Sequence, residues 1–176
     1  MRRIELTPPP PWTITLLKSL CVLLILTVPY NGTSAQSKPA AAFQVKAAYL
    51  YNFTRFVEWK PEEFGGPDAP FVIGILGDKR TAEYLTEIVR GETVGSHPIV
   101  VQQYRTAGEV RNCQILFLSS GEASRAKESI AELNRKGILT VSDADNFLRW
   151  GGMIRFFSRD NKIRIQINTG AARAGQ

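Results

Sequence analysis

Three polar residues that follow apolar runs are the first candidates for chemistry in this sequence. They are Asp78, Ser119 and Asp143, and the run before each is typical of a buried strand. Ligands of open α/β sheets bind outside the carboxyl ends of the strands. Two carboxylates at that edge would suit a ligand that carries an amino group. Helix N-capping requires the same residue types at the same positions, so capping is the simpler interpretation.

The sequence contains no recognisable catalytic set. His97 is the only histidine, and it stands before Pro98 in a predicted turn, whereas general bases and metal ligands are most often histidines. Nucleophile-elbow, dinucleotide-binding and P-loop motifs are absent. The pair Gly74 and Gly77 is better explained as a tight strand-to-helix turn. We therefore expect no catalytic residue, no metal site and no cofactor.

Aromatic side chains crowd a helix predicted over residues 43–59, which Pro61 should end by disfavouring helical geometry at Lys60. Tyr51 and Trp59 fall off the helix's main apolar face. Because Tyr, Trp and Arg are the residues that most often anchor interfaces, Tyr51, Arg55 and Trp59 are candidates for a partner surface. The predicted core face itself consists of Val45, Ala48, Tyr49, Phe53 and Phe56.

The element that these residues surround is the run from Phe71 to Gly77, which is apolar on both alternating faces. Such a strand must be covered on both sides by helices and therefore belongs inside a mostly parallel sheet. Further strands are predicted at residues 98–102, 113–118 and 138–141, with helices at 81–89 and 123–136 and a short helix through Phe147 and Trp150.

Two segments near the end, residues 151–157 and 162–168, alternate between apolar and polar residues and predict an antiparallel hairpin at the sheet edge. Ile163, Ile165 and Ile167 should face the core. Arg155 and Arg164 should share the wet face and could meet an acidic partner. The predicted fold is therefore α/β, with a mostly parallel sheet of about five to six strands flanked by helices and a C-terminal antiparallel hairpin.

The first 35 residues have the pattern of a secretory signal peptide that is cleaved after Ala35. Arg2, Arg3 and Lys18 precede an apolar run, and small residues follow it. A membrane anchor is the alternative, but the run is about half of the roughly 20 residues that a spanning helix needs. We expect a signal peptide at 1–35, a flexible leader at 36–42, a single domain at 43–176 and a periplasmic location.

Charge and cysteine content narrow the choice of partners. The chain of 176 residues carries a net charge of +6, but its basic residues are mixed with acids, so a nucleic-acid surface is not expected. After cleavage Cys113 is the only cysteine left, and no internal disulfide can form. Its place before an apolar strand indicates a buried small hydrophobe.

Three stretches together resemble the YfiR family of bacterial periplasmic proteins. They are Ala47-Ala48-Tyr49-Leu50-Tyr51-Asn52-Phe53-Thr54-Arg55-Phe56-Val57-Glu58-Trp59, the strand from Phe71 to Gly77, and Gly151-Gly152-Met153-Ile154-Arg155-Phe156 with Ile163-Arg164-Ile165-Gln166-Ile167-Asn168. With the signal peptide they span nearly the whole chain in the right order.

The resemblance implies a periplasmic regulator without enzymatic activity. Such a protein represses a membrane-bound diguanylate cyclase by binding its periplasmic segment, and an OmpA-type outer-membrane lipoprotein releases it. A sensor kinase is an alternative target, and a second copy of the chain is a further candidate partner. The sequence departs from the family because typical members have disulfides, which puts redox control in doubt. The family's final helix is also missing, so either the natural chain continues beyond Gln176 or the tail is disordered.

A periplasmic module that binds a small molecule at Asp78, Ser119 and Asp143 is the alternative function. It could act alone or as the sensory input of the regulator.

Overall fold

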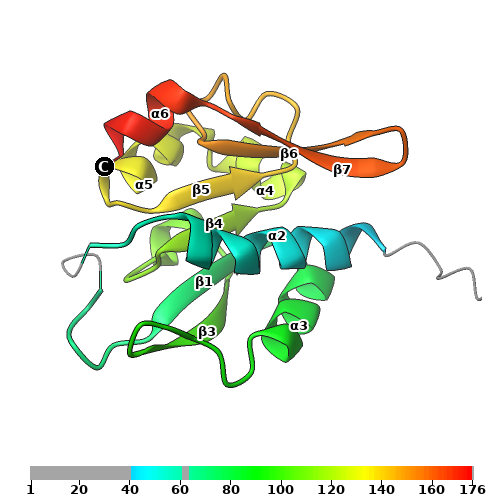
Figure 1. Cartoon of the computed structure of the whole chain (residues 1–176). Helices are drawn as coiled ribbons and strands as arrows, with labels where there is room; N and C mark the ends of the chain where they lie inside the picture. Colours follow the sequence, from blue (N-terminus) through cyan, green and yellow to red (C-terminus); the bar gives the residue numbers. More distant parts are fainter. Residues whose placement is uncertain (1–40, 61–63, 176) are drawn as a thin grey trace, which may run out of the picture. The chain divides into compact units, whose positions relative to one another are not determined.

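A computed structural model of the chain describes residues 41–60 and 64–175, so the predicted signal peptide and most of the predicted leader lie outside the described residues. The described part contains a seven-stranded sheet in the order β2-β3-β1-β4-β5-β6-β7 (Figure 1). Its strands are β1 (Phe71–Leu76), β2 (Thr93–Val94), β3 (His97–Tyr104), β4 (Ile115–Leu118), β5 (Leu139–Ser142), β6 (Ile154–Arg159) and β7 (Lys162–Ile167). The helices are α2 (Ala42–Phe56), α3 (Lys79–Ile88), α4 (Ser120–Arg125), α5 (Ile130–Arg135) and α6 (Thr169–Ala174), with 3₁₀ turns η2 (Ala107–Glu109) and η3 (Lys127–Ser129).

Strand β1 is the buried centre that its apolar sequence predicts. All six of its residues are buried, and it pairs in parallel with β3 on one side and with β4 on the other. Ile73 packs in one cluster with Leu50 of α2 and Leu85 of α3. Val72 belongs to a second cluster on the opposite face with Ile130 of α5. The predicted α/β fold with helices on both faces of a mostly parallel sheet is therefore confirmed (Figure 1).

The C-terminal hairpin is confirmed as an antiparallel pair, with β6 joined in parallel to β5. Its turn consists of Asp160 and Asn161, both at positive φ (52° and 55°), which is the geometry of a type I′ hairpin turn. The prediction that three isoleucines of β7 are core residues is wrong in degree. Ile163 and Ile165 are only half-buried, and Ile167 is 50% exposed, because β7 is an edge strand with no neighbour beyond it among the described residues.

The first helix ends earlier than predicted. It stops at Phe56, and Val57 is already extended. The physical reason lies in Trp59, whose ring packs edge-on against Phe71 at 5.0 Å and whose indole N–H donates to the Thr54 carbonyl oxygen at 3.2 Å. The chain must leave the helix to place this indole on the core.

The predicted apolar face of this helix is also partly wrong. Its buried residues are Ala47, Leu50, Phe53 and Thr54, whereas Phe56 is 81% exposed and Ala48 is exposed. Phe56 lies in the last turn of α2, where the packing against the sheet no longer covers it.

Three smaller predictions also need correction. The helix predicted over residues 123–136 is divided into α4, η3 and α5. None of the residues of η3 is buried, so no packing holds that turn in α geometry. Residues 145–151 form turns rather than a short helix. Strand β2 was not predicted, because two residues joined to β3 through Gly95 at φ 58° are too short to show a period.

Candidate functional site

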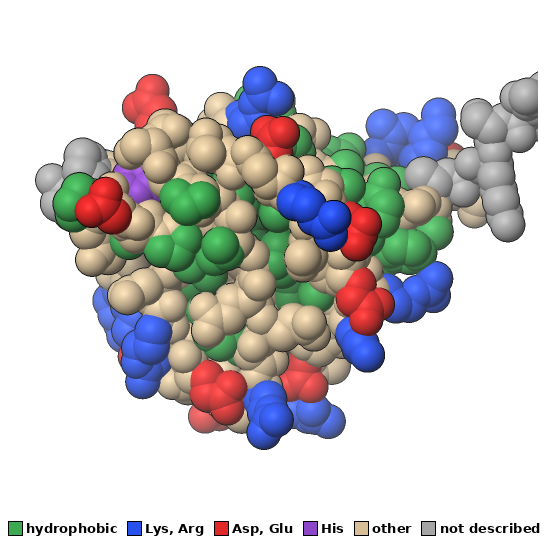
Figure 2. Space-filling view, turned by 90° about the horizontal axis from the view of Figure 1, so that it is seen from below, with side chains coloured by type: hydrophobic (Ala, Val, Ile, Leu, Met, Phe, Trp, Pro, Cys, Tyr) green, Lys and Arg blue, Asp and Glu red, His purple; other side chains and the backbone are tan. Residues whose placement is uncertain are grey.

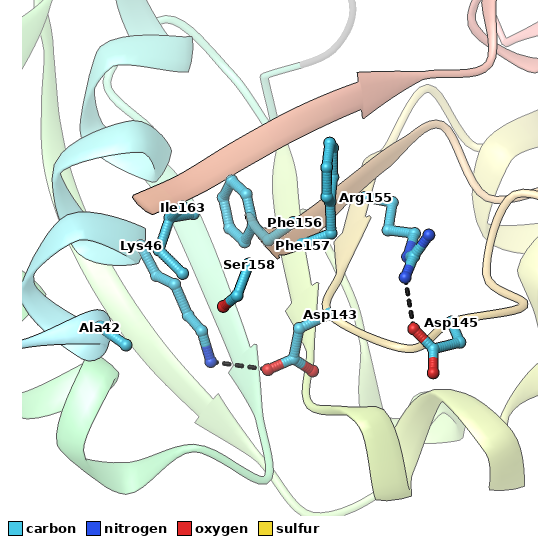
Figure 3. A pocket seen from close by; sticks show the side chains of 9 residues that line it. All are labelled: Ala42, Lys46, Asp143, Asp145, Arg155, Phe156, Phe157, Ser158 and Ile163. Atoms are coloured by element: carbon cyan, nitrogen blue, oxygen red, sulfur yellow. Dashed lines mark hydrogen bonds and ion pairs between the residues drawn. The ribbon is translucent and has the colours of Figure 1, made fainter. Parts of the chain in front are cut away.

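The two predicted carboxylates do meet at the carboxyl edge of the sheet, and a lysine lies between them. Asp78 follows β1 and Asp143 follows β5. The Nζ atom of Lys46, on α2, lies 2.6 Å from Asp143 Oδ2 and 3.7 Å from Asp78 Oδ2 (Figure 3 shows the contact with Asp143). The place expected for a ligand's amino group is therefore taken by the chain's own ammonium group.

Asp78 and Ser119 have different local roles. Asp78 is the N-cap of α3, since its Oδ1 accepts from the Thr81 backbone N–H at 3.0 Å and its Oδ2 accepts from the Thr81 hydroxyl at 2.8 Å. Ser119 occupies the N-cap position of α4, but its side chain makes no capping hydrogen bond. Gly77, at φ 84°, lies so close to Ser119 that a side chain there would collide with it. Capping thus explains Asp78, and close packing explains Gly77.

A hollow of about 480 Å³ opens beside Asp143, between the start of α2 and the hairpin (Figure 3). Arg155 donates to Asp145 inside it and lies 5.7 Å from the centre of the Phe157 ring. Two of the lining residues each have one buried atom, Asp143 Oδ1 and Arg155 Nε, that has no hydrogen-bond partner among the described residues. The residues that line the hollow are Ala42, Lys46, Asp143, Asp145, Arg155, Phe156, Phe157, Ser158 and Ile163.

The candidate partner residues of the first helix differ in exposure. The Tyr51 hydroxyl donates to Glu92 Oε2 at 2.6 Å, and this bond raises the pKa of Tyr51. Tyr51 and Trp59 are both half-buried and pack against the core cluster under α2. Arg55 is exposed. The aromatic ring that is free to meet a partner is that of Phe56, which no feature of the sequence separates from the buried Phe53.

The two candidate arginines of the hairpin share one face, as alternation predicts. Arg155 lies opposite Gln166 and Phe157 lies opposite Arg164, so the two arginines are diagonal neighbours. Their surroundings differ, since Arg155 is half-buried and paired with Asp145, whereas Arg164 is exposed. Arg164 is the better placed of the two for contact with another protein.

The residues that could have supplied nucleophilic or general-base chemistry are held in structural contacts. His97 Nδ1 lies 2.6 Å from the Ala69 carbonyl oxygen, and its ring stacks on Phe64 with centroids 3.8 Å apart. Cys113 is buried and donates to the Ile115 carbonyl oxygen at 3.0 Å. Burial raises the pKa of Cys113 to about 12, so its thiol stays protonated at neutral pH and is a poor nucleophile.

The described part of the chain offers no candidate for a metal cluster or a membrane span. No group of three or more His, Cys, Asp or Glu side chains there could hold a metal ion. None of the helices described is both long and apolar enough to cross a bilayer. On the face that Figure 2 shows, Lys and Arg side chains are interspersed with Asp and Glu rather than gathered into one basic area.

Comparison with known proteins gave one family. The family model described as YfiR/HmsC-like matches residues 43–176 of the chain. The search of curated proteins gave no match.

Proposed function

The chain belongs to the YfiR/HmsC-like family, and we propose that it is a regulator that represses a membrane-bound diguanylate cyclase by binding the periplasmic segment of that enzyme. The family is one of periplasmic, non-catalytic regulators of cyclic di-GMP signalling. The match over residues 43–176 is the observation that carries the proposal. The sequestered positions of His97 and Cys113 support a binding role rather than a catalytic one.

Two exposed sites are proposed as contact surfaces. The first lies at the end of α2, where Arg55 and Phe56 are both exposed and combine a cation with an aromatic ring, as interface anchors often do. The second is Arg164 on the hairpin. Tyr51, Trp59 and Arg155 are assigned a supporting role, because each of them makes a side-chain hydrogen bond within the domain.

Release from the cyclase is assigned to an OmpA-type outer-membrane lipoprotein that competes for the same surfaces. A sensor kinase in place of the cyclase, or a second copy of the chain, would use these surfaces as well. Cys113 cannot provide redox control of release through an internal disulfide, because it is buried and the only cysteine in residues 36–176.

Deletion of the gene in its native host tests the proposal. We expect cyclic di-GMP and biofilm formation to rise, and the full chain to restore both. A variant without residues 1–35 serves as the control, because it should fold without being exported and should fail to restore repression. Unchanged cyclic di-GMP after deletion would contradict the proposal.

The hollow beside Asp143 favours a second candidate function, the binding of a small polar molecule. Asp143 and Arg155, which both line it, carry opposite charges and suit one small ligand that carries both signs of charge. Thermal-shift screening against amino acids and nucleotides tests this function, with Arg155→Leu as the matched variant. A compound that raises the melting temperature of the parent chain but not of Arg155→Leu supports this function. If no compound changes the melting temperature, the role of Asp143 is limited to its ion pair with Lys46.

A further inference from the structure

Among the residues that the structure describes, strand β7 is an open edge of the sheet. It pairs with β6 on one side, and it is the last strand in the order of the sheet. Natural edges are usually short, bulged, covered or charged, because an open edge is a template for another strand, and β7 has only the last of these protections, in Lys162 and Arg164. β7 has six residues, and its register with β6 is continuous over all of them.

The register shows which backbone groups of β7 are free. A two-residue hairpin turn is closed by a hydrogen-bonded pair, here Arg159 and Lys162. Because hydrogen-bonded and non-bonded pairs alternate in an antiparallel ladder, Arg164 and Gln166 also bond to β6. The N–H and C=O groups of Ile163, Ile165 and Ile167 therefore point away from β6, and no further hydrogen bond to them exists among the described residues.

The side chains of β7 define what could lie beside it. Lys162 and Arg164 point to one face, are exposed and form no ion pair within residues 41–60 and 64–175. The three isoleucines point to the other face and are half-buried or exposed. Residues directly opposite each other on neighbouring strands share a face, so acids opposite Lys162 and Arg164, and apolar residues opposite the isoleucines, would fit.

Two occupants from the chain itself fit less well. A second copy paired through β7 would place two sets of Lys162 and Arg164 on one face, and β7 contains no acid to separate them. Residues 1–40 contain one acidic residue, Glu5, and so cannot supply an alternating acidic strand.

We propose that β7 binds an extended segment of a partner protein, with alternating acidic and apolar residues, as an additional strand of the sheet. This inference rests on the proposed function and specifies how the periplasmic segment of the target is held. Main-chain hydrogen bonds to the isoleucines supply affinity, and Lys162 and Arg164 select acidic partners.

The first test uses a fluorescent peptide of about seven alternating Glu and Val residues, a typical strand length, and the chain without residues 1–35. Two N-methylated versions, one modified on every Val and the other on every Glu, each block one edge of the peptide only. We expect one of them to bind at least about tenfold more weakly than the parent peptide and the other to bind normally. Equal binding of all three peptides, equal weakening by both modifications, or no binding of the parent peptide would overturn the proposal.

The second test changes the protein. In Ile165→Pro the lost N–H points away from β6, so the hairpin ladder is kept, and Ile165→Ala is the control for the lost side chain. We expect the Pro variant to bind the peptide about three- to tenfold more weakly than the Ala variant. Equal affinity in folded variants would overturn the proposal. If Ile165→Pro does not fold, the peptide comparison on the parent chain still decides.

The third test concerns charge and the alternative occupants. Arg164→Glu should weaken binding of the Glu-Val peptide about tenfold and strengthen binding of a Lys-Val peptide. If the variant still prefers the Glu-Val peptide as the parent does, the proposal is overturned. If the parent chain sediments as a dimer and Ile165→Pro sediments as a monomer, the proposal is overturned, and the occupant of β7 is a second copy of the chain. The gene deletion and the peptide binding are independent measurements. If deletion changes cyclic di-GMP but β7 does not bind the peptide, only this inference is refuted. If β7 binds the peptide but deletion leaves cyclic di-GMP unchanged, only the proposed target is refuted.

Discussion

Phe53 and Phe56 show how two equivalent residues in a sequence can have opposite roles. Phe53 is buried and stacks on Phe156 with centroids 6.3 Å apart. Phe56, three residues later, is 81% exposed. The exposure of a large aromatic ring is unfavourable in water, and so a partner that covers Phe56 would gain affinity from it.

The first prediction compares these two residues. Phe56→Ser should change the free energy of unfolding by less than about 0.5 kcal/mol but weaken binding to the target. Phe53→Ala should cost about 3–5 kcal/mol, because it leaves a cavity under α2. Urea denaturation and a binding assay with the purified periplasmic segment measure both. A Phe56→Ser variant that binds as tightly as the parent would remove the end of α2 from the contact surface.

The second prediction concerns alkaline stability. Burial raises the pKa of Cys113 from 9.0 to about 12 and that of Tyr104 from 10.0 to about 12. Both groups ionise at lower pH in the unfolded chain than in the folded one, so their contribution to stability is complete below about pH 9 and is lost as the pH rises toward 12. The free energy of unfolding should fall by about 2 kcal/mol between pH 8 and pH 10.5, mostly because of Cys113.

The matched variant for this prediction is Cys113→Ala combined with Tyr104→Phe, which removes both titrating groups. Denaturation curves recorded from pH 7 to pH 10.5 should show a clearly flatter profile for the double variant. Parallel profiles would mean that other groups cause the alkaline loss.

At the scale of elements, the hairpin separates folding from binding. Arg164→Glu should leave the melting temperature almost unchanged, since changes at exposed positions usually matter by less than about 0.5 kcal/mol. Ile165→Ala should cost only about 1–2 kcal/mol, less than the roughly 2–5 kcal/mol expected for full burial, because Ile165 is half-buried. Thermal unfolding checks both values. If Arg164→Glu lowers the melting temperature as much as Ile165→Ala, the basic face of β7 is structural.

The elements that could be predicted are those whose burial creates a period. β1 is apolar on both faces because helices cover both of them, and the hairpin alternates because each of its strands has one wet face. The end of α2 could not be predicted, because this helix ends where the contact between Trp59 and Phe71 requires it. That contact depends on a neighbouring strand and leaves no local signal.

The candidate site was predictable to the same extent. Asp78 and Asp143 could be placed at one edge, because the carboxyl ends of parallel strands meet there. Lys46 could not be placed there from the sequence, since it precedes Asp143 by 97 positions and lies on a helix whose orientation the sequence does not define. This missing residue changes the chemistry, because it converts an apparent amine-binding pair into an internal ion pair.

At the scale of the whole molecule, the described domain holds the titratable groups that were considered for chemistry in internal contacts and exposes two of the proposed contact residues. Asp78, Asp143 and His97 all contact groups of the domain itself. Phe56 and Arg164 have exposed side chains, at the end of α2 and on the edge strand. Such a distribution suits the proposed binding role, in which the protein must reach the periplasmic segment of its target.

The last prediction is therefore export with cleavage after Ala35. Positive residues, an apolar run shorter than a spanning helix needs and the small residues before Gln36 are together the features of a cleaved signal peptide. Protein isolated from the periplasm should have Gln36 as its first residue, which intact mass spectrometry measures directly. The Ala35→Phe variant should block cleavage at this site, since the peptidase accepts only small side chains there, and should leave an uncleaved species in the membrane fraction. If the parent chain itself is found uncleaved in that fraction, the first residues are an anchor, and repression must then occur from the membrane surface.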